Sequence, residues 1–157
     1  MLRPLKILFL CTGNSCRSQM AEAWARKQLH PKRFEAYSAG TKPGSLDPRA
    51  VRVMAEAGID MSGQRSKSVE QLVSVHPDCV ITVCDAANEV CPVFPVSARR
   101  IHAGFDDPPK LASSAIDEEA ALAPYRRVRD EIRDYVARLP ELLAVLEPGG
   151  GERGGDS

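Results

Sequence analysis

The stretch LCTGNSCRS, residues 10–18, decides the fold that we expect for this chain. The preceding residues 5–10, LKILFL, are mostly apolar, which predicts a strand buried on both faces. Apolar residues then recur at helical spacing, which predicts a helix from Ser18 to about Leu29. Residues 11–17 therefore form a short loop between a buried strand and a helix.

Cys11 and Arg17 stand at the two ends of this loop. A loop of this length before a helix can direct its backbone N–H groups at one tetrahedral oxyanion, and the helix N-terminus adds partial positive charge. Gly13 and Asn14 tolerate the left-handed backbone angles that such a nest requires. Arg17 offers a planar pair of donors to two oxygens of the oxyanion.

The same positive surroundings favour the thiolate form of Cys11, which makes this residue a candidate nucleophile. Ser18 can donate a hydrogen bond to that thiolate. The expected oxyanion-binding residues form one continuous run: Thr12, Gly13, Asn14, Ser15, Cys16, Arg17 and Ser18. The alternative, that Cys11 is a small buried apolar residue in an ordinary turn, is disfavoured by the position of the loop between a strand and a helix.

Strand and helix patterns alternate along the rest of the chain. Further strands are expected at residues 34–39, 79–83 and 99–104, and helices at 48–57, 69–75 and 124–146, the first capped by Asp47 and the last kinked at Pro140. This alternation predicts an α/β fold, with a four-stranded parallel sheet and helices on both faces. Ligands bind such sheets at the carboxyl ends of strands, so we expect Cys11, Cys84 and the loop after Gly104 at one edge.

Size and composition exclude several classes of protein. The 157 residues suit one domain, which we place at residues 1–147, before a glycine-rich tail at 148–157 that we expect to be disordered. Lys plus Arg and Asp plus Glu number 21 each, so the chain lacks the basic field that nucleic-acid binding needs. We find no apolar run long enough for a membrane span and no signal peptide. We therefore expect a cytoplasmic protein, and a monomer.

A family resemblance rests on several motifs. LCTGNSCRS resembles the oxyanion-binding loop of the low-molecular-weight protein tyrosine phosphatases. The following SQMAEAW is similar to the thioredoxin-coupled arsenate reductases, which are built on the same fold. The similarity continues through the motifs AYSAGTKP, AGIDMSGQRSK, ITVCDAANEVCP and HAGFDDP, and it covers most of residues 5–140.

Two of the five cysteines, Cys84 and Cys91, exceed what a phosphatase needs. The resemblance implies that they form a redox pair, whereas the residues alone leave a zinc pair or inert thiols open. Their spacing does not match the usual zinc spacing. On a helix their Cα atoms would lie about 10 Å apart, beyond the roughly 7 Å limit of a disulfide, so pairing requires the segment between them to unwind. We assign no role to Cys79 and expect Cys16 to line the loop.

The resemblance implies a reaction that uses three thiols. Cys11 attacks arsenate held by the loop, Cys84 then attacks the sulfur of Cys11 and releases arsenite, and Cys91 takes over the disulfide. Thioredoxin is implied as the external reductant, with no bound cofactor and no metal. The sequence does not decide between thioredoxin and a small thiol such as glutathione.

Asp107 is the expected general acid, because the family places its acid directly before a proline. Asp106 is expected to be structural, and His102 receives no role. The alternative for Asp107 is a turn or cap residue, which aspartate before proline often is. Only 4 Phe, 3 Tyr and 1 Trp occur in the chain, and none follows Asp107 directly, so a wall for a phosphotyrosine ring is not evident. This favours a small inorganic oxyanion.

Some relatives bind a monovalent cation through an Asn, a Glu, a Ser and an Asp. Asn14, Glu22 and Ser38 match the first three, but Lys67 stands at the fourth position. We therefore expect the Lys67 ammonium to take the place of the cation, with Glu22 as its partner. The alternative is that Lys67 points into solvent.

Two other functions stay open at this stage. A phosphatase needs only Cys11, Arg17 and Asp107. A regulatory protein that senses oxyanions or thiol redox state could use the same loop without turnover.

Overall fold

The computed structural model describes residues 3–85, 94–95 and 97–144. Its four strands are β1 (Leu5–Cys11), β2 (Phe34–Gly40), β3 (Cys79–Thr82) and β4 (Arg99–His102). They form one sheet in the order β2-β1-β3-β4, and each neighbouring pair runs parallel. The four-stranded parallel sheet that the sequence predicts is confirmed.

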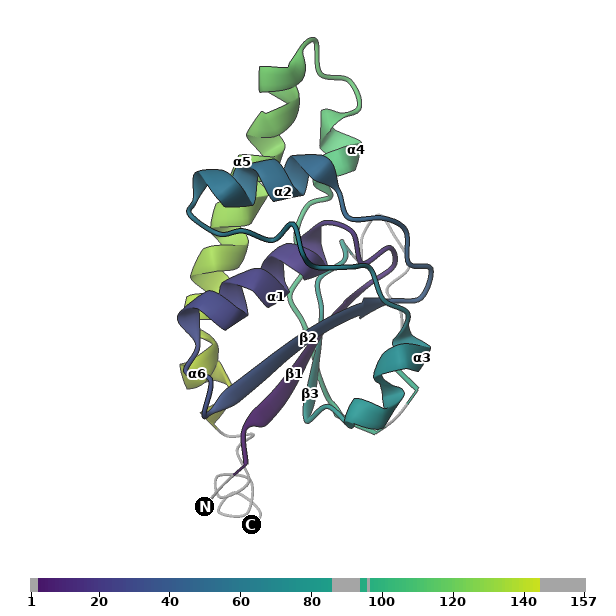
Figure 1. The fold of residues 1–157 in the computed structure, drawn as a ribbon, viewed down its shortest axis with the longest axis vertical. Helices are drawn as coiled ribbons and strands as arrows, with labels where there is room; N and C mark the ends of the chain where they lie inside the picture. The colour runs from purple at the N-terminus through teal and green to yellow at the C-terminus, as the bar shows by residue number, and fades with distance from the viewer. Residues whose placement is uncertain (1–2, 86–93, 96, 145–157) are drawn as a thin grey trace.

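Side chains of β1 alternate between two apolar layers, as the two-residue period of a strand requires. Leu5, Ile7 and Phe9 belong to the larger core cluster, whereas Leu8 and Leu10 belong to the smaller one. The larger cluster packs under α1 (Arg17–Gln28), α2 (Pro48–Glu56) and α5 (Glu118–Ala137), and the smaller one under α3 (Val69–Leu72) and the 3-10 turn η1 (Val73–Val75). Helices therefore cover both faces of the sheet (Figure 1).

The C-terminal helices differ from the expectation. α5 begins at Glu118 and not at Pro124, because the Asp117 carboxylate accepts a hydrogen bond from the N–H of Ala120 at 2.8 Å and caps the helix there. Pro124 lies inside α5. Pro140 does not kink one long helix, since α5 ends at Ala137 and Pro140 lies in the first turn of α6 (Leu139–Leu142), where its missing N–H costs nothing.

A short helix that was not expected, α4 (Pro108–Ala112), follows the Asp106–Asp107 pair. Most of the segment between Cys84 and Cys91, which their predicted pairing requires to unwind, lies outside the described residues, as does the whole predicted tail at residues 148–157. Within the part of the chain that the structure describes, no helix is both long and apolar enough to cross a lipid bilayer.

Strand order brings distant parts of the chain to one edge. β1 and β3 are neighbours with Leu10 opposite Thr82, and the N–H of Val83 donates to the carbonyl of Leu10 at 3.0 Å. The N–H of Phe105 in turn donates to the carbonyl of Val83 at 3.3 Å. The loop after β1, the residues after β3 and the loop after β4 therefore meet at the carboxyl edge of the sheet, as predicted.

Candidate functional site

Cys11 ends β1 and is buried, with its sulfur facing two hydrogen-bond donors. The N–H of Asn14 donates to Cys11 Sγ at 3.2 Å, and Ser18 Oγ lies 2.9 Å from the same sulfur. Asn14 Nδ2 donates to Ser18 Oγ at 2.8 Å, which leaves the Ser18 hydroxyl hydrogen for the sulfur. Both donors stabilise the anionic form of Cys11, so the geometry suits a nucleophilic thiolate.

Asn14 is fully buried and adopts a left-handed backbone angle, φ 49°. Both Gly13 and Asn14 were expected to allow this conformation, and of the two only Asn14 adopts it. Asn14 Oδ1 accepts from the N–H of Lys67 at 2.8 Å and from Gln19 Nε2 at 3.0 Å. The hydroxyl of Ser66 donates to the backbone carbonyl of Asn14 at 2.6 Å. Asn14 is therefore the point at which the loop is fixed to the rest of the molecule.

Arg17 begins α1 and is only 7% exposed, so its buried guanidinium needs hydrogen-bond and charge partners. Its Nη1 donates to the carbonyl of Phe105 at 2.9 Å, and its Nη2 lies 3.7 Å from Asp107 Oδ1. The loop after β4 thus orients the guanidinium. Asp106 instead pairs with Arg127 on the surface of α5 at 2.8 Å, which fits the structural role expected for it.

A cavity of about 230 Å³ opens over the loop. Its lining consists of Cys11, Thr12, Gly13, Ser15, Cys16, Arg17, Asp107 and Pro109. Of the run predicted to bind the oxyanion, Asn14 and Ser18 do not line the cavity. Both are fully buried behind it, where they hold the loop and Cys11 Sγ. Their contribution is to position the nucleophile.

The remaining cysteines have distinct environments. Burial raises the pKa of Cys16 well above that of an ordinary thiol, and it raises the pKa of Cys79 to about 12. Both are free thiols, as is Cys11. Cys84, which follows β3, is fully buried and disulfide-bonded. Cys91 lies outside the described residues, so its pairing with Cys84 stays a prediction.

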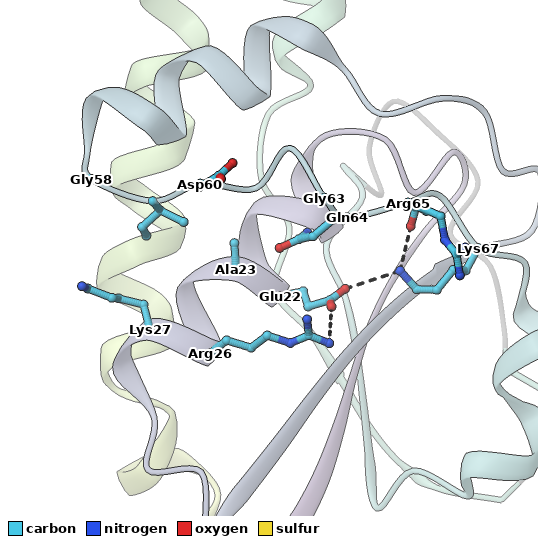
Figure 2. Close-up of a pocket in the computed structure, with 11 residues that line it drawn as sticks. Glu22, Ala23, Arg26, Lys27, Gly58, Asp60, Gly63, Gln64, Arg65 and Lys67 are labelled. Atoms are coloured by element: carbon cyan, nitrogen blue, oxygen red, sulfur yellow. Dashed lines mark hydrogen bonds and ion pairs between the residues drawn. The ribbon is translucent and has the colours of Figure 1, made fainter.

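Lys67 contacts the residues that the sequence analysis assigned to it. Its Nζ lies 3.6 Å from Glu22 Oε1 and donates to the carbonyl of Arg65 at 2.8 Å (Figure 2). The same Nζ lies 3.5 Å from Ser38 Oγ. The pairing of Lys67 with Glu22 is confirmed. Burial lowers the pKa of Lys67, and the Glu22 carboxylate opposes that shift.

Sequence reasoning missed several residues that build the site. A Cβ on Gly40 would lie 2.3 Å from the carbonyl oxygen of Thr12, so only glycine allows β2 to approach the loop this closely. Gln19 Nε2 donates to the carbonyls of Asn14 and Arg65 at 2.9 and 2.8 Å. Gly40 directly follows the strand predicted at residues 34–39, but neither Gly40 nor Gln19 carries a local sequence signal for its contact with the loop. The described residues contain no group of three or more His, Cys, Asp or Glu that could hold a metal ion.

Comparisons with known proteins agree with this geometry. Residues 6–147 match the family described as low molecular weight phosphotyrosine protein phosphatase, and the chain belongs to that family. Within it, the chain is similar to proteins named arsenate reductase. Those of Halalkalibacterium halodurans and Bacillus licheniformis are 49% and 47% identical to it over 135 residues, which are 86% of this chain and 94% of each relative.

The chain is also similar to a solved structure of an arsenate reductase. The structure of an arsenate reductase in the phosphate binding state aligns with a TM-score of 0.70 at 30% identity, over 88% of this chain and 98% of that one. The fold is thus shared with a protein of this name.

Proposed function

We propose that this protein reduces arsenate to arsenite through a covalent adduct on Cys11 and a relay of three thiols. The observation that carries the proposal is a disulfide-bonded cysteine that follows the strand next to the one that ends in the oxyanion-binding loop. Cys84 follows the strand next to β1 and is disulfide-bonded, whereas Cys11 is a free thiol with two donors on its sulfur. Similarity to proteins named arsenate reductase supports the same reaction.

In the first step, the Cys11 thiolate attacks the arsenic atom of arsenate held by the loop and Arg17. One arsenate oxygen leaves as water after accepting a proton, for which Asp107 is placed beside Arg17 at 3.7 Å. A bond between Cys11 Sγ and arsenic(V) results. The chain supplies the positive charge for this step through the loop amides and the guanidinium.

In the second step, the Cys84 thiolate attacks Cys11 Sγ. The electron pair of the sulfur–arsenic bond passes to arsenic, which leaves as arsenite, and a Cys11–Cys84 disulfide forms. Two electrons have then moved from two thiols to arsenic. Cys91 attacks Cys84 next, which frees Cys11 and leaves a Cys84–Cys91 disulfide for an external dithiol to reduce.

We propose thioredoxin as that dithiol in the cytoplasm, and a steady-state assay tests it. Arsenate-dependent NADPH consumption with thioredoxin and its reductase should continue over many cycles, and glutathione should not replace thioredoxin. Cys84→Ser and Cys91→Ser should each abolish sustained turnover. Cys79→Ala is the matched control, because Cys79 is a buried free thiol in β3, and it should retain turnover. Sustained arsenite production by Cys84→Ser would refute the relay.

Phosphatase activity is the second candidate, because the family match and the Cys11, Arg17 and Asp107 set suffice for it. Turnover of a phosphotyrosine peptide that is unaffected by Cys84→Ser, with no reduction of arsenate, would favour this function. Among the described residues, the lining of the cavity of about 230 Å³ includes Pro109 and no aromatic residue, which favours the smaller substrate.

A further inference from the structure

A second cavity, separate from the one over the loop, lies between α1 and the segment 58–67 that follows α2 (Figure 2). Its volume is about 570 Å³, more than twice that of the cavity over Cys11. None of the residues that the structure describes lines both cavities. Nothing in the proposed reaction uses this space, and we call it the α1 cleft.

The α1 cleft carries an excess of positive charge. Four cationic side chains line it, Arg26, Lys27, Arg65 and Lys67, against two carboxylates, Glu22 and Asp60. Asp60 accepts hydrogen bonds from the hydroxyl and the backbone N–H of Ser62, and these bonds lower its pKa. Asp60 therefore stays charged, but its carboxylate already has hydrogen-bond partners in its own turn.

One buried carboxylate serves two of the cations. Glu22 is 2% exposed and lies between Arg26 Nη2 at 2.5 Å and Lys67 Nζ at 3.6 Å (Figure 2). It also accepts from the hydroxyl of Ser38. Within the described residues, Lys27 and Arg65 form no ion pair with a carboxylate. Cations that line one cleft without a counter-charge favour the binding of an anion there.

We propose that the α1 cleft binds a small polyanion, a molecule that carries two or more phosphate or carboxylate groups. A single tetrahedral oxyanion matches the smaller cavity over Cys11, whereas four cations spread over both walls of a larger cleft match several anionic groups at once. Arg26 and Lys27 come from α1, and Arg65 and Lys67 come from the opposite wall. Guanidinium groups on both walls suit bidentate contacts with such groups.

The wall of the α1 cleft is also the support of the catalytic loop. Gln64 Nε2 donates to Gln19 Oε1 at 2.6 Å, the hydroxyl of Ser66 donates to the carbonyl of Asn14, and the N–H of Lys67 donates to Asn14 Oδ1. A polyanion that neutralises Arg65 and Lys67 orders this wall and, through Asn14, the loop. The polyanion therefore tightens the binding of an oxyanion at the loop, and an oxyanion at the loop tightens the binding of the polyanion by the same factor.

Titration with inorganic tripolyphosphate at low ionic strength, followed by backbone amide NMR, tests the binding site. The amides of Gly63, Arg65 and Lys67 report on the cleft, and those of Gly13 and Ser15 report on the loop. Lys27→Gln combined with Arg65→Gln should weaken binding at the cleft at least about fivefold, because two exposed charge contacts are lost. Lys32→Gln combined with Arg52→Gln removes the same charge outside the cleft and should leave the affinity unchanged. Cleft amides that do not shift, or equal affinities in the two double variants, would overturn the site.

The coupling is tested by titrating inorganic phosphate into the loop with and without tripolyphosphate. Tripolyphosphate should tighten phosphate binding in the unmodified protein and have no such effect in the Lys27→Gln/Arg65→Gln protein. Weaker phosphate binding in both proteins would mean that tripolyphosphate only competes at the loop, and this result would overturn the coupling. The binding test does not depend on which reaction the loop catalyses.

Discussion

Asn14 connects the nucleophile to the residues behind the loop. Its backbone N–H reaches Cys11 Sγ, its amide nitrogen holds Ser18, and its amide oxygen accepts from Gln19 and Lys67. A left-handed φ of 49° makes these contacts compatible, and asparagine tolerates that angle better than most residues. One buried side chain thus fixes the loop, the nucleophile and the position of Lys67.

Because Lys67 occupies the position beside Glu22 and Ser38, we expect potassium to have no specific effect on stability. Because its ammonium already lies beside Glu22 and Ser38, potassium should raise the melting temperature no more than sodium does at equal ionic strength. Lys67→Asp places a carboxylate where the ammonium lies, so in that variant potassium should raise the melting temperature by about 2–4 °C over sodium. Lys67→Met is the control, with no response to either ion. A strong, potassium-specific rise in the unmodified protein would contradict the assignment.

The cap of α2, Asp47, also connects this helix to α5 and to the loop at the site. Asp47 caps α2 by accepting from the N–H of Arg49 at 2.9 Å, and its other oxygen accepts from the hydroxyl of Tyr125 on α5 at 2.7 Å. Asp47 also lies under the loop, because its N–H donates to the carbonyl of Ser15 at 3.0 Å. The cap that the sequence indicates therefore also joins α2 to α5 and to the loop.

Asp47→Ala should cost more stability than the loss of an ordinary cap. The cap itself contributes about 1 kcal/mol, and the Tyr125 hydroxyl left without its partner adds roughly 1–2 kcal/mol. Asp117→Ala is the matched control, because Asp117 caps α5 through Ala120 from an exposed position, and it should cost about 1 kcal/mol. Urea unfolding of both variants measures the difference. Equal losses would show that the Tyr125 contact contributes nothing.

Elements with a local signal could be predicted from the sequence. The buried strand β1, the cap at Asp47 and the Glu22–Lys67 pair each follow from patterns within a few residues or from a family motif. The start of α5 was misplaced because Pro124 suggested a first turn, whereas Asp117 supplies a better cap. The need for glycine at residue 40 depends on a contact with Thr12 across two strands, which no local pattern contains.

At the scale of the whole molecule, ion pairs join α2 to α5 on the side of the sheet that carries α1. Glu56 on α2 pairs with Arg126 at 2.8 Å and with Arg129 at 3.3 Å, both on α5. Arg49 on α2 pairs with Glu118 at 3.0 Å. The hydrogen bond from Arg126 is the main reason that the pKa of Glu56 falls from 4.5 to about 2.

This lowered pKa predicts how stability depends on pH. A carboxyl whose pKa is lower in the folded state stabilises the fold above its ordinary pKa and loses that effect as it is protonated. The contribution of Glu56 should therefore be present above pH 4.5 and disappear as the pH falls towards about 2. Arg126→Gln should flatten the stability curve in this window, as measured by urea unfolding across pH. Arg133→Gln, which removes pairs within α5 only, should leave the slope unchanged.

The central claim is that electrons reach arsenic from Cys11 and Cys84, with Cys91 needed only afterwards. A single-turnover experiment tests it most directly: reduced protein, freed of small thiols, is mixed with excess arsenate and the released arsenite is counted. Cys91→Ser should release one equivalent of arsenite and stop, because Cys11 and Cys84 together supply the two electrons. Cys84→Ser should release none. Arsenite from Cys84→Ser in the first turnover would contradict the account, as would its absence from Cys91→Ser.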